Sequence, residues 1–362
     1  MEQPFYIKNI FSKFDSESVH RFIIGLLQLI KNIPLTKSLF KKKYFYTSEK
    51  IKVKIFDLEF PNPIGLAAGF DKNCIVDSFW EALGFGFYEL GTVTLKSQPG
   101  FVRPRIFRFP ENLALVNQMG FPNEGIESIQ ARLEGKVHSV PRGLSIGKSL
   151  GCPLEQAPLE YAQLVTKSFC FVDYFSINIS SPNTPEIGKL QNREYLKILL
   201  DHIDQAQASQ AKKYNVKLKP VFVKVSPDCS LQVLEDIVGT LKGRSLYGVI
   251  ATNSTQDKSL YSKKMPQLGG LSGAPLREKS TEVIRKIYKL SAGTIPIIGC
   301  GGIFTVRDAI EKIRAGASLL QIYTSFIYYG PELVRELAYG LHSEIESLGF
   351  SSLKQLIGLD SK

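Results

Sequence analysis

The feature that most constrains this chain is a regular alternation of short strand-like runs with amphipathic helical stretches, from about residue 60 onward. The runs are rich in β-branched, aromatic and small residues, and the stretches between them repeat apolar residues with the period of a helix. The strand-like runs are residues 63–69, 85–94, 143–149, 174–180, 220–226, 247–253, 295–302 and 319–326. The helical stretches are residues 155–169, 194–211, 231–241, 278–290, 306–315 and 332–348.

Eight β/α units over about 300 residues predict a closed (β/α)8 barrel, the TIM-barrel architecture. A doubly wound open sheet is the alternative, because it is built from the same units. The apolar content, 44% of 362 residues, is enough to fill a core of this size. No low-complexity linker divides the region, so we expect one catalytic domain over residues 46–362 and a separate extension over residues 1–45.

The extension is basic and apolar, because the first 50 residues hold nine Lys or Arg and four Asp or Glu. Helix-start signals at Asp15 and Ser16 introduce an amphipathic helix. Its two stripes are Arg21, Gly25, Gln28 and Asn32 on one side and Ile23, Leu26, Leu27 and Ile30 on the other. A short apolar segment over residues 5–14 precedes it, and Pro34 is expected to end the pair. Such a pair suits either an anchor on an anionic membrane surface or a cap packed on the core.

Charge and cysteine content narrow the function without deciding it. The net charge of +11 favours an anionic partner, which includes nucleic acid, an anionic membrane surface and phosphate or carboxylate ligands. The five cysteines are widely spaced and contain no C-x-x-C pair, so neither a disulfide framework nor a metal site is expected. No apolar run reaches the roughly 18 residues that a membrane-spanning helix needs.

Polar side chains gather where the predicted strands end, which is the face where barrel enzymes place their reactive groups. These positions carry small, amide, hydroxyl or lysine side chains, a set that suits a planar heterocycle with polar edges. In N-x-x-S-x-N, Asn178 and Asn183 flank Ser181, and carboxamides match the edge of a cyclic imide or amide. An ordinary turn around Pro182 is the alternative.

Two further features of this face point to an anionic ligand. Lys224 ends an apolar strand, so its ammonium needs an anionic partner, either a ligand or a nearby Asp or Glu. The glycine clusters at residues 269–273 and 299–302 are expected to precede the seventh and eighth barrel helices. Glycine there lets backbone N–H groups approach a phosphate, which this fold usually binds in the loops after strands seven and eight.

Several stretches together resemble dihydroorotate dehydrogenases. They are NPIGLAAGFDK at residues 62–72, GFGFYELGTVT at 84–94, NISSPNTP at 178–185, IATNST at 250–255 and QIYT at 321–324. The resemblance runs from Asp15 to the last helix. Residues 15–35, with His20 among them, are similar to the N-terminal extension of the membrane-associated, quinone-using class 2 enzymes. Ser181 also fits class 2, since class 1 enzymes carry cysteine there.

The resemblance implies oxidation of (S)-dihydroorotate to orotate in de novo pyrimidine biosynthesis, with FMN as hydride acceptor and a membrane quinone as final oxidant. The implied FMN-binding residues are Ala68, Gly69, Thr92, Ser145, Asn178, Lys224, Thr252, Gly273, Gly301, Gly302, Tyr323 and Thr324. The implied substrate-binding residues are Lys72, Asn117, Gln118, Met119, Gly120, Phe121, Asn178, Asn183, Asn253 and Ser254. His20, Arg108 and Tyr323 are implied to face the quinone.

The resemblance also implies the chemical roles. Ser181 removes the C5 proton while the C6 hydride goes to flavin N5, and Thr184 and an ordered water carry the proton onward. Lys224 stabilises negative charge on the reduced flavin near N1. Some positions depart from the family pattern: Ser145 replaces Asn, Gln118 replaces Arg, Pro122 replaces Asn, and residues 185–189 lack the usual arginine. We expect these changes to affect lid motion and turnover rather than the reaction itself.

Two other functions compete with this interpretation. A tRNA dihydrouridine synthase suits the basic charge but normally adds a helical RNA-binding domain and a catalytic cysteine. An inactive membrane-associated barrel scaffold is the other, and the intact Lys72, Ser181 and Lys224 argue against it. We expect a monomer with no nucleic-acid partner. Its expected location is peripheral, on the cytoplasmic face of a cell inner membrane or, in a eukaryote, on the mitochondrial inner membrane.

Overall fold

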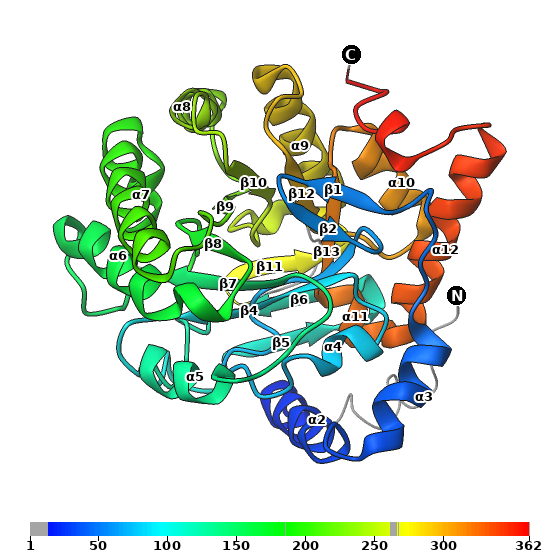
Figure 1. Ribbon diagram of the computed structural model, residues 1–362, viewed down its shortest axis with the longest axis horizontal. Helices are drawn as coiled ribbons and strands as arrows, with labels where there is room; N and C mark the ends of the chain where they lie inside the picture. The colour runs from blue at the N-terminus through cyan, green and yellow to red at the C-terminus, as the bar shows by residue number, and fades with distance from the viewer. Residues whose placement is uncertain (1–13, 185, 261–265, 267, 362) are drawn as a thin grey trace.

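Parallel strands form a closed barrel at the centre of the molecule (Figure 1). This computed structural model describes residues 14–184, 186–260, 266 and 268–361. The barrel strands are β3 (Ile64–Leu66), β4 (Phe87–Val93), β7 (Arg142–Gly147), β8 (Tyr174–Asn178), β9 (Val221–Val225), β10 (Tyr247–Ala251), β12 (Ile297–Cys300) and β13 (Leu319–Ile322). Each coincides with a predicted run, and β10 pairs with β9 to close the circle. The barrel is confirmed, and the open sheet is wrong.

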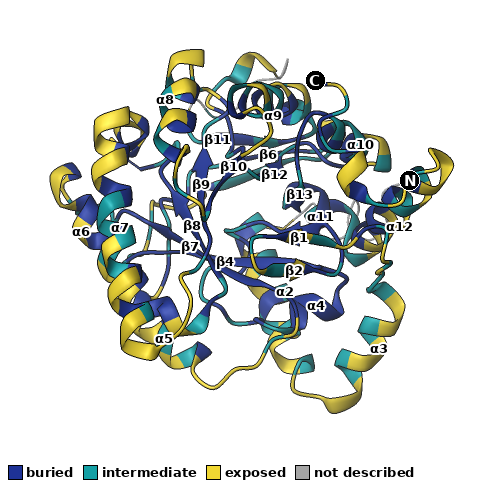
Figure 2. Cartoon of the chain, turned by 45° about the horizontal axis from the view of Figure 1, so that its top comes forward, coloured by how far each residue is buried: buried dark blue, intermediate teal, exposed yellow. Residues whose placement is uncertain are grey.

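Helices surround the barrel and turn their exposed faces outward (Figure 2). They are α4 (Phe79–Ala82), α5 (Ile126–Leu133), α6 (Ala157–Ser168), α7 (Arg193–Tyr214), α8 (Leu231–Leu241), α9 (Arg277–Ser291), α10 (Val306–Arg314), α11 (Thr324–Tyr329) and α12 (Pro331–Ser347). The six predicted helices are confirmed to within a few residues. Their starts follow local rules: Ser230 caps α8, and Thr305 and Asp308 form a capping box on α10. The sequence did not predict the short α4, α5 and α11.

A hairpin closes the amino-terminal mouth of the barrel. It consists of β1 (Val53–Ile55) and β2 (Leu58–Phe60), whose Ile55 and Phe60 pack in one buried cluster with Phe87 and Phe222. Because these aromatic rings fill the lower barrel, ligands have access only from the carboxyl ends of the strands.

A second sheet, not predicted from the sequence, stands over that open end. It is antiparallel and contains β5 (Ile106–Phe109), β6 (Ala114–Asn117) and β11 (Gly270–Gly273), in the order β11-β6-β5. Asn117 pairs with Gly270 at one end of it. The sheet therefore brings segments more than 150 residues apart to the same rim.

Two helices precede the barrel and lie side by side at its edge (Figure 1). They are α2 (Ser16–Ile30), whose start is capped by Asp15, and α3 (Pro34–Tyr44). Pro34 begins α3 instead of ending a pair, because the first turn of a helix needs no N–H from its residue. Most of the predicted segment 5–14 lies outside the described residues. Helix α2 contacts β5, and α3 contacts α4 and α12.

Across the residues that the structure describes, every helix is too short or too polar to cross a bilayer.

Candidate active site

One cavity of about 450 Å³ collects nearly all of the predicted site residues. It extends from the carboxyl ends of the barrel strands to the inner faces of α2 and α3. The predicted residues that line it are His20, Ala68, Gly69, Lys72, Thr92, Arg108, Asn117, Met119, Gly120, Phe121, Asn178, Ser181, Asn183, Lys224, Thr252, Asn253, Ser254, Gly273, Gly301, Gly302, Tyr323 and Thr324. The other three, Gln118, Ser145 and Thr184, do not line it.

Lys224 lies at the end of β9, only 5% exposed, with its side chain lining the cavity. Within the described part of the chain, no hydrogen bond or salt bridge holds its ammonium group. The alternative in which a nearby Asp or Glu forms a direct ion pair with it is therefore wrong. A buried cation without a direct partner suits an anionic ligand.

Hydroxyl and carboxamide groups form a connected row beside Lys224. The Asn178 amide donates to Thr92 Oγ1 at 3.1 Å, and the Asn253 amide donates to Asn178 Oδ1 at 3.3 Å. The Ser145 hydroxyl lies 2.9 Å from Thr92 Oγ1, on the side away from the cavity. Ser145 thus contacts Thr92, a residue that lines the cavity, and its predicted contact with FMN stays a prediction. Tyr161, which the sequence did not single out, donates to the Asn178 carbonyl at 2.9 Å.

The serine loop is both a turn and part of the site. Ser181 Oγ accepts from the Asn183 N–H at 3.3 Å, as in a local turn, and both side chains line the cavity. The Asn183 amide donates to Asn117 Oδ1 at 3.3 Å, which joins the loop to β6. Thr184 is buried, and its hydroxyl has no hydrogen-bond partner among the described residues. A buried hydroxyl three residues from Ser181 is available to bind water.

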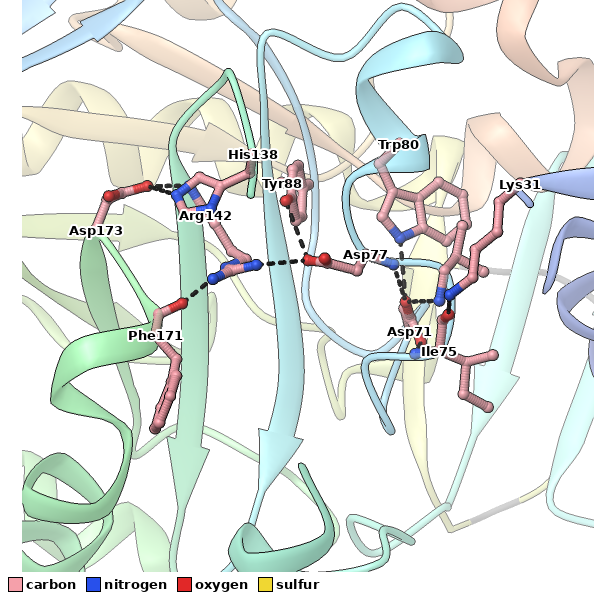
Figure 3. Close-up of polar contacts among 11 residues, drawn as sticks. Lys31, Asp71, Ile75, Asp77, Trp80, Tyr88, His138, Arg142, Phe171 and Asp173 are labelled. Carbon is pink, nitrogen blue, oxygen red and sulfur yellow. Dashed lines mark hydrogen bonds and ion pairs between the residues drawn. The ribbon is translucent and has the colours of Figure 1, made fainter. Parts of the chain in front are cut away.

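Lys72 is held in the cavity by the turn that follows β3. Asp71 accepts from the N–H groups of Ile75 and Val76 at 2.7 and 2.8 Å and from the Trp80 indole at 3.2 Å (Figure 3). The Lys72 ammonium donates to the Gly69 carbonyl. Burial lowers the pKa of Lys72 to about 8, and a carboxylate ligand beside it would raise that pKa by stabilising the charged form. The sequence did not single out Asp71 because its role depends on contacts with the following residues.

The part of the cavity beside α2 is largely apolar. The His20 ring packs edge-on against Phe70, with centroids 4.9 Å apart. Burial and the Lys72 charge lower the pKa of His20 to about 3, so the imidazole is neutral. Tyr323 donates to the Gly69 carbonyl at 3.3 Å, and burial raises its pKa to about 12. Arg108 donates to the Phe14 carbonyl, which links β5 to the start of the described chain.

The glycine clusters precede α9 and α10, which follow the sixth and seventh barrel strands, so their predicted position before the seventh and eighth barrel helices is wrong. Gly273 ends β11, which pairs with β6 outside the barrel. Gly273 and Gly302 have φ angles of 101° and 72°, which favour glycine. Thr324, after strand eight, still meets this region because its hydroxyl lies 3.0 Å from Ser272 Oγ.

Two residues that the sequence analysis missed connect α2 to this site. Glu17 and Arg105 are both buried and form an ion pair. Arg103 is also within 2.9 Å of the Glu17 carboxylate. The only sequence signal was an acidic residue in a basic segment, which by itself is usual at a helix start.

The comparison with protein families is decisive. The family model for dihydroorotate dehydrogenase matches residues 50–345. The chain belongs to the dihydroorotate dehydrogenase family. It is therefore an oxidoreductase that oxidises dihydroorotate in pyrimidine biosynthesis, and the resemblance seen in the sequence is confirmed. The tRNA dihydrouridine synthase and the inactive scaffold are not supported.

Individual relatives agree with the family. The chain is 42% identical over 344 residues to the dihydroorotate dehydrogenase (quinone) of Gloeobacter violaceus, covering 95% of each chain. It is 44% identical over 326 residues to the protein of the same name from Christiangramia forsetii, covering 90% of this chain and 94% of that protein. The crystal structure of the Eimeria tenella dihydroorotate dehydrogenase in complex with ferulenol superposes with a TM-score of 0.89 at 31% identity, covering 100% of both chains.

Proposed function

We propose that the chain transfers a hydride from (S)-dihydroorotate to FMN and passes the electrons on to a membrane quinone. The observation that carries this proposal is that one cavity joins Lys224, Ser181 and Lys72 to the apolar inner face of α2. Polar groups for a substrate and an apolar route for a long-chain oxidant thus open into the same space.

The residues present fit FMN. A planar ring with polar edges matches the Thr92, Asn178 and Lys224 side chains, which line one side of the cavity. A phosphate suits the glycine-rich backbone at Gly301 and Gly302, where both φ angles are positive. When bound, FMN supplies the hydride-accepting chemistry that no side chain can provide.

The remaining polar groups suit dihydroorotate. Lys72 would bind the substrate carboxylate, because it lines the same cavity as Ser181 and Asn183 and is not assigned to the flavin. Asn117, Asn178, Asn183 and Asn253 would bind the ring amides, since each carboxamide both donates and accepts. Their mutual hydrogen bonds hold them in place before substrate arrives.

Ser181 would take the C5 proton as the hydride leaves C6. A serine is a weak base, so the proton must pass onward promptly. Thr184 supports this role because its buried hydroxyl has no protein partner among the described residues and lies in the same loop. A water bound there would connect Ser181 to the exterior when the loop opens.

The membrane side of the proposal is supported by a second apolar face on the N-terminal helices. Ile24 is buried toward the barrel, whereas Phe22, Leu29, Leu35 and Leu39 are 62%, 71%, 73% and 64% exposed. Leu26, a member of the predicted apolar stripe, is also exposed, so α2 has apolar residues on both sides. Figure 2 shows the largely exposed outer surface of α3 at the edge of the molecule. An outward apolar face flanked by lysines suits a membrane surface.

We propose that the enzyme is a monomer and binds peripherally to an anionic membrane, at the cytoplasmic face of a bacterial inner membrane or on the mitochondrial inner membrane of a eukaryote. Some lysines of α3 have another role, since Lys37 and Lys41 both pair with the buried carboxylate of Glu81. His20, Arg108 and Tyr323 would face the quinone where the cavity passes under α2.

The experiment is the visible spectrum of the purified protein, followed by anaerobic addition of dihydroorotate. A bound flavin that bleaches with dihydroorotate and recovers with a long-chain quinone supports the proposal. Protein that is folded but repeatedly lacks flavin, or flavin that dihydroorotate does not bleach, contradicts it. Release and chromatographic identification of the chromophore separates FMN from other flavins.

A further inference from the structure

The barrel interior contains a polar layer directly below Lys224. Side chains alternate along each strand, so inward residues from alternate strands stack in layers. Lys224 is in register with Asn178 on one side and Ile250 on the other. Because the strands tilt, residues in hydrogen-bond register lie at different heights along the barrel axis. The layer beneath Lys224 is made by alternate barrel strands and consists of Glu89 of β4, Ser176 of β8, Ile250 of β10 and Gln321 of β13.

This layer is unusual for the middle of a barrel, which is normally filled by branched apolar residues. All four side chains are completely buried, and only Ile250 is apolar. The level below returns to the usual composition, with Phe87, Phe222 and Leu319 in one apolar cluster. The polar layer is therefore a local feature between the packed lower barrel and the cavity floor.

The polar groups of this layer are only partly paired. Gln321 donates to Glu89 Oε2 at 2.9 Å. Glu89 Oε1, Gln321 Oε1 and Ser176 Oγ have no hydrogen-bond partner among the described residues. The Tyr174 hydroxyl below lies close to both Gln321 and Glu89, and hydrogen bonding to them affects its pKa. Burial and the Glu89 carboxylate hold the pKa of Tyr174 well above its usual range, so its hydroxyl remains a donor. Two unpaired acceptors and two hydroxyls gathered in one buried place can be satisfied together by internal water.

Lys224 and Glu89 lie in successive layers of the barrel interior, as the strand register shows. Cys300 of β12 is also buried, and burial raises its pKa, a rise that the Lys224 charge opposes and the Glu89 charge increases. Lys224 has no direct ion pair among the described residues, and Glu89 is the acidic side chain of the layer beneath it. A buried cation and a buried carboxylate one layer apart compensate each other without contact, because the interior screens charge poorly.

We propose that Glu89 is a positioning residue for the flavin reaction: through the polar layer it balances the charge of Lys224 and thereby lowers the reduction potential of the bound flavin. This inference rests on the proposed role of Lys224. With Glu89 in place, the site is close to neutral while the flavin is oxidised. Without it, the uncompensated ammonium would favour the reduced, negatively charged flavin too strongly, and electrons would pass to the quinone less readily.

The test is the flavin midpoint potential of Glu89→Gln, measured by spectroelectrochemistry on the flavin-loaded protein. Glutamine keeps the size of the side chain and removes its charge. We expect the ratio of reduced to oxidised flavin at a fixed potential to rise at least tenfold, a shift of about 30 mV for a two-electron couple. The matched control is Tyr174→Phe, which removes a hydroxyl of the same cluster without changing charge and should shift that ratio less than threefold.

The experiment distinguishes failure of this inference from failure of the proposed function. An unchanged potential in Glu89→Gln, or an equal shift in Tyr174→Phe, overturns this inference while leaving the proposed function intact. A parent protein without flavin counts instead against the proposed function.

A second measurement covers the case in which Glu89→Gln loses flavin or folds poorly. The thermal midpoints of flavin-free parent, Glu89→Gln, Lys224→Met and the double variant form a cycle. If the two charges balance each other, the double variant is more stable than the sum of the single effects predicts, because neither charge is left alone. Additive effects overturn the inference, as does a double variant that fails to fold.

Discussion

Glu17 of α2 and Arg105, the residue before β5, form a buried bidentate ion pair. Arg105 Nε lies 2.9 Å from Glu17 Oε2, and Nη2 lies 2.8 Å from Oε1. The same guanidinium donates to the Pro99 and Phe101 carbonyls at 2.6 and 2.7 Å, and the Arg105 carbonyl accepts from the Gln118 N–H at 2.9 Å. One arginine thus ties the N-terminal helix to the segment that leads into the substrate site.

The first prediction follows from this pair. Glu17→Gln leaves a buried guanidinium without its counter-charge, which typically costs about 3 kcal/mol. We expect α2 to undock, so that limited proteolysis cuts within residues 14–44 and quinone turnover falls while dihydroorotate still bleaches the flavin. The control is Arg21→Gln, an exposed charge on the same helix. Equal proteolysis and turnover in Glu17→Gln and the parent contradict the coupling.

The second prediction concerns pH. Lys72 must be protonated to bind a carboxylate, and burial lowers its pKa to about 8 in the free protein. As pH rises through 8 the ammonium loses its proton, so kcat/KM for dihydroorotate should fall on the alkaline side, because that ratio reports groups of the free enzyme. Lys72→Arg keeps the charge and should shift this alkaline limb beyond pH 10. If kcat/KM of Lys72→Arg falls at the same alkaline pH as that of the parent, the decrease reports the titration of another group and contradicts this prediction.

The third prediction concerns Ser181. Ser181→Ala removes only the proton acceptor, so flavin content and dihydroorotate affinity should remain. Flavin reduction in anaerobic stopped flow should slow by about two to four orders of magnitude, the usual size of a general-base effect. Ser180→Ala, a buried neighbour that accepts from Asn253 at 3.1 Å, is the comparison. Near-normal reduction by Ser181→Ala refutes the assigned role.

The fourth prediction concerns Lys224. Lys224→Ala should weaken flavin retention and slow reduction together, because the ammonium is proposed to act on the cofactor itself. Equilibrium dialysis against FMN and stopped-flow reduction measure the two effects separately. Lys219→Ala is the control, since this lysine donates to the Val172 carbonyl away from the cavity. A Lys224→Ala protein that holds flavin and is reduced at the parent rate contradicts the assignment.

The fifth prediction tests the outer face of the N-terminal helices without removing Glu17. Phe22→Ser with Leu29→Ser and Leu39→Ser should weaken binding to vesicles that contain anionic lipid and lower turnover with a long-chain quinone. Turnover with a small soluble dye should stay unchanged, because none of these residues lines the cavity. Ser substitutions at exposed Leu159 and Ile198 on the barrel helices are the control. Unaltered vesicle binding by the triple variant means that this face is not the anchor.

Truncation is a less specific test of the same question. A chain starting near Tyr46 loses the outer apolar face and also leaves Arg105 without Glu17. Loss of flavin or stability in that chain could therefore come from loss of the ion pair or from loss of the apolar face. The triple variant changes the apolar face alone.

Local periodicity and end signals in the sequence determined the barrel. The runs that became β8 and β9 are apolar because both faces of a parallel strand are buried, and α8 has the residues of an amphipathic helix after a serine cap. The carboxyl-end rule then placed Lys224, Asn178 and Ser181 on one rim. These features depend on residues close in the chain, so they could be predicted without a fold.

Contacts between distant segments depended on the tertiary structure. The β5, β6 and β11 sheet was missed because its strands are short and pair antiparallel outside the barrel. Only the tertiary structure shows that Ser145 forms a hydrogen bond with Thr92 of the neighbouring strand.

The sequence by itself determined the fold class, the family and the residues that face the cavity, because these follow from patterns repeated along the chain and from short motifs. Only the tertiary structure showed that Glu17 forms an ion pair with Arg105 and that Glu89 is buried in the barrel interior, where it accepts from Gln321. A carboxylate has the same chemistry wherever it stands in a sequence. Its role is decided by the burial and the partners that folding gives it, since a buried charge must be balanced and an exposed one need not be.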